Sequence, residues 1–204
     1  MMGWVTLTMM GWVTLTIVGV ALVALLATAY VLVVTGRVTI DTGWGRRVRP
    51  LGPMTRTIRA PRDVVFELIG VPYLAANPPR EIRDKVEVVE RGDGMVLAAH
   101  RTRSGPITTV TLESVTFAPP EEIRFHLVRG PVPHVEERFA LRELEDGAAT
   151  ELLYEGELGT DGWSLGAWWG KVVATRWEGV VADSMEAVAR EAEARADRWR
   201  RRGA

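Results

Sequence analysis

The chain of 204 residues contains no cysteine. This absence excludes disulfide bonds, thiolate nucleophiles and zinc sites built on Cys ligands. The one asparagine, Asn77, precedes Pro78, so the chain also lacks an N-glycosylation sequon. Charge is missing from the first 36 residues, and Ile17 to Val34 form an almost unbroken apolar run. An uncharged segment of this length predicts a membrane anchor rather than a surface helix.

The apolar segment from Trp12 to Thr35 is long enough to cross a bilayer. About 20 residues at 1.5 Å per residue span a hydrocarbon core of roughly 30 Å. Four arginines and a single aspartate follow the run closely: Arg37, Arg46, Arg47, Arg49 and Asp41. The positive-inside rule therefore predicts a single-pass protein of the inner or cell membrane with a cytoplasmic C-terminal domain.

A cleaved signal peptide is the alternative interpretation of this segment, because Ala27-Thr28-Ala29 resembles a cleavage site. The segment lacks the basic region that precedes the apolar core of such signals, and Tyr30 to Val34 extend the run beyond the site. An anchor is therefore favoured. The octapeptide MMGWVTLT occurs twice in succession, which leaves the true start methionine open without changing the span.

Three parts follow from the composition. Residues 1–36 form the transmembrane anchor, residues 37–54 an irregular linker rich in Arg, Gly and Pro that gives the tether slack, and residues 55–204 one folded domain. The net charge of −1 does not favour nucleic-acid binding. The basic end, Arg198 to Arg202, has two interpretations that both stay open: contact with anionic lipid headgroups, or complementation of a helix dipole.

The residue patterns predict an α+β domain. A short strand at 55–60 precedes a helix that begins after Pro61 and buries Val64, Val65 and Phe66. Six short strands separated by Gly and Pro turns follow between Arg83 and Gly159. One long helix closes the chain, from about Ser164 to Arg200, and becomes polar and projecting after Arg190. Its expected apolar stripe consists of Trp169, Val173, Trp177, Val180, Ser184 and Val188.

This order of elements, together with three stretches, resembles the START-like (SRPBCC) superfamily, which includes polyketide cyclases and dehydrases, Bet v 1-like proteins and lipid-transfer domains. The stretches are Thr57 to Phe66, Phe117 to Phe125, and Glu137 to Arg142 with the strand pair around Gly147 to Gly156. The resemblance implies a helix-grip fold, in which a curved antiparallel sheet wraps around the long C-terminal helix. It also implies a hydrophobic cavity between sheet and helix, but it transfers no catalytic residue.

Polar residues on the inward strand faces are the most informative candidates for a site. If Val135, Phe139 and Leu141 point inward, the period of two places Glu137 there as well, where burial would raise its pKa. A rim position with a solvated Glu137 is the alternative. The candidate cavity residues are Phe125, Glu137, Phe139, Leu152, Tyr154, Trp169, Val173 and Trp177.

Two other chemistries find little support. Gly162 to Gly166 matches the G-x-S-x-G motif of serine hydrolases, but no histidine follows His134 and the predicted sheet is antiparallel. Ser164 is better explained as the N-cap or a first-turn residue of the last helix, with Asp161 as the competing cap. The three histidines lack the spacing of a metal motif, so neither a metal nor a cofactor is predicted.

The leading hypothesis is a membrane-tethered domain that binds a hydrophobic small molecule or lipid. One alternative is a cyclase or dehydrase that uses Glu137, Tyr154 or His100. A second is a non-catalytic membrane-associated interaction module that uses Arg190 to Arg202.

Overall fold

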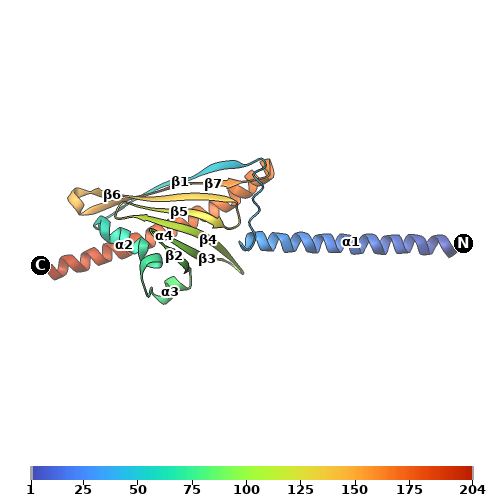
Figure 1. Cartoon of the computed structure of the whole chain (residues 1–204), viewed down its shortest axis with the longest axis horizontal. Coiled ribbons are helices and arrows are strands. Elements are labelled where there is room, and N and C mark those ends of the chain that lie inside the picture. Colours follow the sequence, from blue (N-terminus) through green and yellow to red (C-terminus); the bar gives the residue numbers. More distant parts are fainter. Residues whose placement is uncertain (1, 204) are drawn as a thin grey trace.

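The computed structural model describes residues 2–203, which form one long N-terminal helix and a domain built on a seven-stranded sheet (Figure 1). The elements in chain order are α1 (Met2–Val34), β1 (Arg47–Ile58), α2 (Arg62–Leu74), α3 (Arg80–Arg83), β2 (Val86–Gly92), β3 (Met95–Ser104), β4 (Ile107–Ala118), β5 (Glu122–Arg129), β6 (His134–Leu144), the 3₁₀ turn Glu145–Gly147, β7 (Ala149–Thr160) and α4 (Trp163–Gly203).

The sheet has the order β1-β7-β6-β5-β4-β3-β2, with every neighbouring pair antiparallel. Strands β2 to β7 are therefore the predicted six-stranded meander, and β1 closes the edge by pairing with β7. Helix α4 packs against β1, β7 and α2 on one face of this sheet. The α+β helix-grip architecture predicted from the sequence is confirmed.

Strand β1 is longer than predicted, because it begins at Arg47 rather than Thr55. The Gly and Pro residues that suggested an irregular segment are accommodated by a bulge between Leu51 and Met54. Strand β1 is an edge strand, so the missing N–H of a proline can face the side on which no other strand needs a hydrogen bond. The Gly52 amide in this bulge donates to the Glu178 carboxylate of α4 at 2.9 Å. The bulge therefore also fastens the sheet edge to the long helix.

The buried stripe of α4 is offset from the prediction. Val180 is 43% exposed and Ser184 is also exposed, whereas Val181 and Met185 are buried one position further on. The stripe then continues through three alanines, Ala189, Ala192 and Ala196, so the helix does not project immediately after Arg190 as predicted. Small side chains leave little hydrophobic signal in the sequence, yet these three belong to the hydrophobic core, and the ion pair between Arg195 and Glu67 at 3.0 Å joins this part of α4 to α2.

Helix α1 contains the stretch Trp12–Val34, which is long and apolar enough to cross a membrane and is not buried against the domain. Helix α1 ends at Val34, and Gly36, two residues beyond, has φ of +70°. The Gly36 amide donates to the Val33 carbonyl and the Arg37 amide to the Leu32 carbonyl, both at 2.9 Å. This is the Schellman arrangement, which satisfies carbonyls that a helix end otherwise leaves without partners.

The end of α1 is attached to strand β4. Strand β5 pairs with β4 only from Leu112 onward, which leaves the first residues of β4 without a strand partner on that side. The Val110 amide there donates to the Thr35 carbonyl at 3.0 Å, and the Thr109 hydroxyl donates to the Val34 carbonyl at 2.9 Å. The chain leaving the helix thus completes an open sheet edge.

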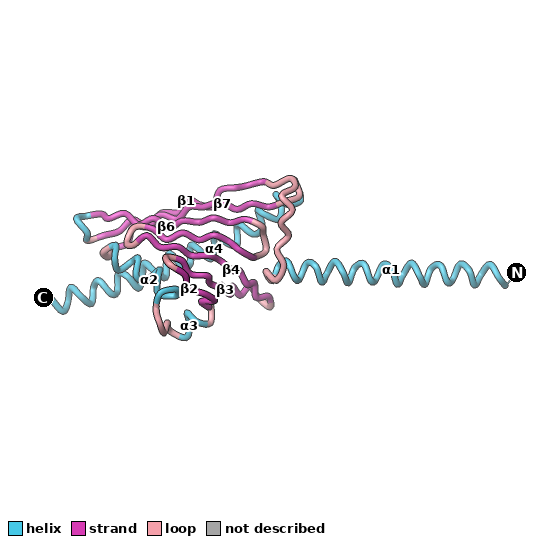
Figure 2. Tube along the Cα trace, in the orientation of Figure 1, coloured by secondary structure: helices cyan, strands magenta, loops and turns pink. Residues whose placement is uncertain are grey.

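The segment between α1 and β1 is also held against the domain (Figure 2). The Thr39 hydroxyl bonds to the backbone of Gly130 at 2.8 Å. The Asp161 carboxylate accepts the amides of Thr42 and Gly43 at 2.7 and 2.8 Å and the Arg46 guanidinium at 2.8 Å. The slack expected for this linker is therefore absent from residues 37–46.

Candidate functional site

The face of the sheet that α4 covers carries two groups of buried polar side chains. On β6, Val135, Glu137 and Leu141 are buried, so the alternation predicted from the sequence is correct. Glu137 is 8% exposed, which excludes the solvated rim position. On β4, Glu113 is buried as well, with 4% exposure.

Glu137 joins three elements through one oxygen. Its Oε1 accepts the Tyr154 hydroxyl from β7 and the Trp177 indole N–H from α4, each at 2.6 Å. A buried carboxylate needs such donors, because an unpaired charge removed from water destabilises the folded state by roughly several kcal/mol. Sheet and helix thus meet at this side chain.

Glu113 belongs to the second group. Its Oε1 accepts the Thr111 hydroxyl at 2.6 Å, and its Oε2 lies 2.8 Å from Nδ1 of His100 on β3. The other ring nitrogen of His100, Nε2, lies 3.1 Å from the hydroxyl of Tyr73 on α2. Tyr73, His100 and Glu113 therefore form a continuous hydrogen-bonded chain across three elements.

Burial and neighbouring charge shift the pKa values of both groups. Burial raises the pKa of Glu137 to about 7, and the Glu113 charge adds to this, whereas the hydrogen bonds from Tyr154 and Trp177 and the His100 charge oppose it. Burial alone would lower the pKa of His100, but the charge and hydrogen bond of Glu113 outweigh it, so the net direction is upward. Glu137 is therefore poised to gain or lose a proton near neutral pH.

Aromatic rings connect the two groups. Tyr154 and Phe139 have centroids 5.2 Å apart, Phe139 and Phe125 are 5.7 Å apart, and Phe125 lies 5.7 Å from Tyr73 and 6.3 Å from His100. Phe139 stays partly exposed although its inward neighbours on β6 are buried. Phe139 and the partly exposed His100 are therefore the points of this row that α4 leaves accessible to solvent.

The structure brings five of the eight candidate cavity residues into this site: Glu137, Tyr154, Trp177, Phe139 and Phe125. The other three lie elsewhere. Leu152 and Val173 are buried core residues, with 0% and 8% exposure, and the Trp169 indole donates to the Pro131 carbonyl at 3.0 Å in the turn between β5 and β6.

Sequence reasoning missed Glu113, Thr111 and Tyr73. For the two residues on β4 a signal existed, because they share a period of two with Val115, which is buried. The apolar Leu112 lies between them and masks that alternation. No local pattern pointed to Tyr73, which reaches the site only because α2 packs over this part of the sheet.

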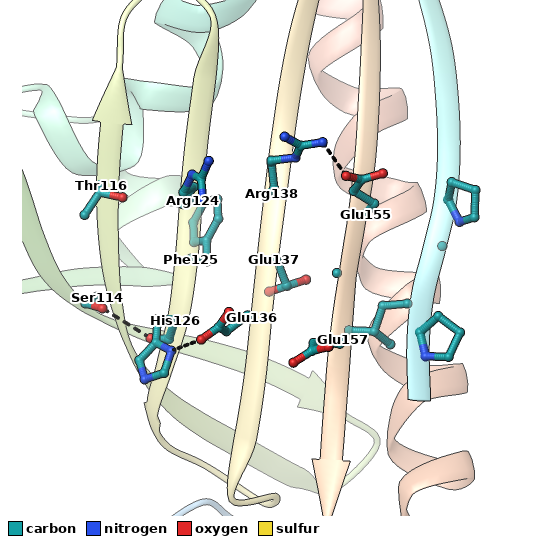
Figure 3. Close-up of a pocket in the computed structure, with 15 residues that line it drawn as sticks. Ser114, Thr116, Arg124, Phe125, His126, Glu136, Glu137, Arg138, Glu155 and Glu157 are labelled. Atoms are coloured by element: carbon teal, nitrogen blue, oxygen red, sulfur yellow. Dashed lines mark hydrogen bonds and ion pairs between the residues drawn. The ribbon is translucent and has the colours of Figure 1, made fainter. Parts of the chain in front are cut away.

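A hollow of about 660 Å³ lies on the opposite, outer face of the sheet (Figure 3). Its charged side chains neutralise one another: Arg138 points to Glu155, and His126 lies 3.3 Å from Glu136. This hollow is open, and Phe125 and Glu137 of the inner-face site are also among the residues that line it. Within residues 2–203, no group of three or more His, Asp or Glu side chains has an arrangement that could hold a metal ion.

Comparison with solved structures identifies proteins of the same fold. The Zhui aromatase/cyclase from Streptomyces sp. R1128 aligns with a TM-score of 0.56 and 22% identity, covering 74% of this chain and 95% of that one. Norcoclaurine synthase from Thalictrum flavum, in complex with dopamine and hydroxybenzaldehyde, aligns with a TM-score of 0.53 and 12% identity over 71% and 85% of the two chains.

The di-domain ARO/CYC BexL from the BE-7585A biosynthetic pathway aligns with a TM-score of 0.50 and 17% identity, and the match covers 74% of this chain and half of that protein. No protein-family model matches the sequence, and no curated protein matches it either. At these identities the likeness concerns the fold alone, and it agrees with the START-like architecture inferred from the sequence.

Proposed function

We propose that this helix-grip protein is anchored in a membrane by α1 and binds an apolar or amphipathic small molecule, such as a lipid, on the inner face of its sheet. The observation that carries the proposal is the buried cluster of Glu137, Tyr154 and Trp177 beside a row of aromatic rings, of which Phe139 stays partly exposed. Ligand sites typically combine an apolar lining with a few convergent polar groups. The solved structures of the same fold include an enzyme described in complex with dopamine and hydroxybenzaldehyde, which are small aromatic molecules.

The site combines apolar surfaces with polar groups, as the binding of an amphipathic ligand requires. Phe125 and Phe139 offer flat apolar surfaces to the ligand body. The Glu137 carboxyl group and the Tyr73 hydroxyl lie at the two ends of that row, and each can form a further hydrogen bond beyond those within the chain, whereas both ring nitrogens of His100 are already bonded. Because such polar groups are costly to bury without partners, a ligand that bonds to them gains specificity as well as affinity.

Anchoring favours a ligand that dissolves in the bilayer. The charge-free stretch Trp12–Val34 has the length and hydropathy of a membrane span. Arginines follow it and none precedes it, so the proposed location of the domain is the cytoplasmic side. A tethered domain meets membrane-dissolved ligands at a raised effective concentration.

The binding test uses the full chain purified in mild detergent. Native mass spectrometry and solvent extraction should find a bound apolar molecule, or saturable binding of fatty acids, phospholipids or small phenols. Phe139→Trp should obstruct the proposed binding surface with its larger ring and weaken binding at least several-fold, whereas Val128→Trp, at a position 53% exposed, should not. Failure of all these ligands to bind the wild-type chain would contradict the proposal.

Catalysis is the second candidate, favoured by the convergence of Glu137, Tyr154 and His100. A carboxyl with a pKa of about 7 next to a His–Glu pair suits general acid–base chemistry, as a cyclase or dehydrase requires. The distinguishing experiment follows the mass of the bound molecule over time. Turnover by wild type that Glu137→Gln abolishes without loss of binding supports an enzyme, and an unchanged ligand in both supports a binding protein.

A further inference from the structure

We propose that the end of the domain from which α1 leaves is a membrane-docking surface, which inserts exposed tryptophan and leucine side chains into the headgroup region of the bilayer that holds α1. This inference rests on the proposed membrane anchoring and adds to it a defined contact and orientation. The docking surface consists of six exposed apolar residues: Val38, Ile40, Trp44, Trp163, Leu165 and Trp168.

These side chains are unusually exposed for their size. Trp44 is 75% exposed, Leu165 is 76% exposed and Trp168 is 62% exposed. They come from two segments that are fastened together, since the Gly162 amide donates to the Trp44 carbonyl at 2.8 Å and the Trp163 amide to the Gly45 carbonyl at 3.1 Å. A contiguous exposed apolar patch of this kind marks an interaction surface.

The position of the patch identifies its partner. The turn between β7 and α4 and the chain leaving α1 lie at the same end of the sheet, the end nearest α1 (Figures 1 and 2). The contacts of α1 with Val110 and of the linker with Asp161 hold this end next to the helix instead of letting the domain swing on a loose tether. If α1 spans a bilayer, that bilayer is the apolar partner that is always beside this end.

The residue types match a membrane interface. Tryptophan concentrates at the headgroup level, where its ring is partly apolar and its N–H finds water or lipid oxygen. Basic side chains accompany the patch: Arg37, Arg103, Arg129 and Lys171 are exposed and have no ion pair within the described part of the chain. The nearby acids Asp41 and Asp161 are both bonded to Arg46, so the surface attracts anionic headgroups.

The basic C-terminal end of α4 lies far from the docking surface. Helix α4 starts at the docking surface and runs 41 residues, about 60 Å, to the opposite end of the domain (Figure 1). The sequence-based suggestion that Arg198 to Arg202 contact the same bilayer is therefore not supported. One end of the domain faces the membrane, and the arginine-rich end points away from it.

The absence of cysteine makes a direct test simple. Leu165→Cys carries a nitroxide label at the docking surface, and Asp93→Cys carries it in the exposed β2–β3 turn. That turn lies at the other end of the sheet, since Met95 pairs with Thr116 rather than with the part of β4 that holds α1. Leu22→Cys reports on α1 itself. The full chain is placed in phosphatidylcholine–phosphatidylglycerol vesicles, and collisions with oxygen and with a water-soluble nickel complex are measured.

Docking predicts that the label at 165 collides several-fold less with nickel and more with oxygen than the label at 93. Adding Trp168→Glu should restore nickel access at 165, whereas Trp199→Glu, near the far C-terminus, should not. A label at 165 as open to nickel as that at 93, while the label at 22 lies in lipid, overturns docking and leaves anchoring intact.

Shielding of the label at 165 from both reagents would show a protein partner or a second copy, and it also overturns the inference. A label at 22 that is open to the nickel complex would overturn the anchoring together with the docking.

Discussion

Replacing Glu137 with Gln should remove most of the pH dependence of the protein's stability between about pH 4.5 and pH 7. The folded-state pKa of Glu137 is about 7, against an ordinary value of 4.5. Between these values the folded protein holds a proton that the unfolded chain has released, so stability falls as the pH rises through this window. The contribution is complete below pH 4.5 and is lost once the pH passes about 7.

The size of the effect follows from the gap between the two pKa values. One pKa unit corresponds to about 1.4 kcal/mol, so the unfolding free energy should be lower by about 3.5 kcal/mol at alkaline pH, where Glu137 is a buried carboxylate, than at acid pH. Glutamine keeps the Oε1 that accepts the Tyr154 and Trp177 donors, but it does not titrate. The variant should therefore be more stable than wild type at pH 8 and nearly equal to it at pH 5.

Thermal unfolding of the full chain in detergent micelles, followed by circular dichroism at pH 5, 6, 7 and 8, measures this difference. Glu136→Gln is the matched control, because Glu136 is the adjacent residue but is exposed on the other face. His100 also has a raised pKa and adds a slope of the same sign; Glu137→Gln reduces this slope only in part, because the charge and hydrogen bond of Glu113 raise the His100 pKa more than the Glu137 charge does. A Glu137→Gln profile parallel to that of wild type would refute the assignment of a buried, proton-binding carboxyl.

Three further changes test other contacts. Tyr154→Phe removes one of the two donors to Glu137, so in the same assay it should lower the free energy of unfolding by about 1–3 kcal/mol at pH 8 and by less at pH 5. An equal decrease at both pH values would contradict the reasoning. Asp161→Asn should loosen the linker and speed tryptic cleavage within residues 37–46, whereas Asp41→Asn, at an exposed position, should have little effect. Gly36→Ala places a Cβ 1.9 Å from a β4 carbonyl at φ of +70° and should speed hydrogen exchange in the first residues of β4, while unchanged exchange would argue against docking of α1 there.

The order of elements was predictable because each depends on local patterns. Turns containing Gly and Pro separated the six meander strands, and an amphipathic pattern announced the long helix. The errors occurred where tertiary contacts override local preference. Pro50 and Pro53 belong to strand β1 because an edge strand with a bulge tolerates them.

The candidate site was predictable only in part. The period of two offered an inward position for Glu137 beside the alternative of a solvated rim position, and it placed Tyr154 on the same face as Leu152. The hydrogen bonds that join Glu137 to Tyr154 and Trp177 follow from strand register and from the rotation of α4, which the misplaced helix stripe shows to be poorly determined by the sequence. Glu113 escaped notice because apolar Leu112 interrupts its pattern.

The sequence by itself determined the properties that arise within a short stretch: an uncharged helix long enough to cross a bilayer, the period of each strand, and the exclusion of thiol chemistry. Only the tertiary structure decided which side chains meet. Asp161 holds a linker more than 110 residues earlier in the chain, and Tyr73, His100 and Glu113 come together from three elements. Local sequence patterns reflect the preference of each segment for a helix or a strand. Contacts between distant residues depend instead on how all the elements pack together.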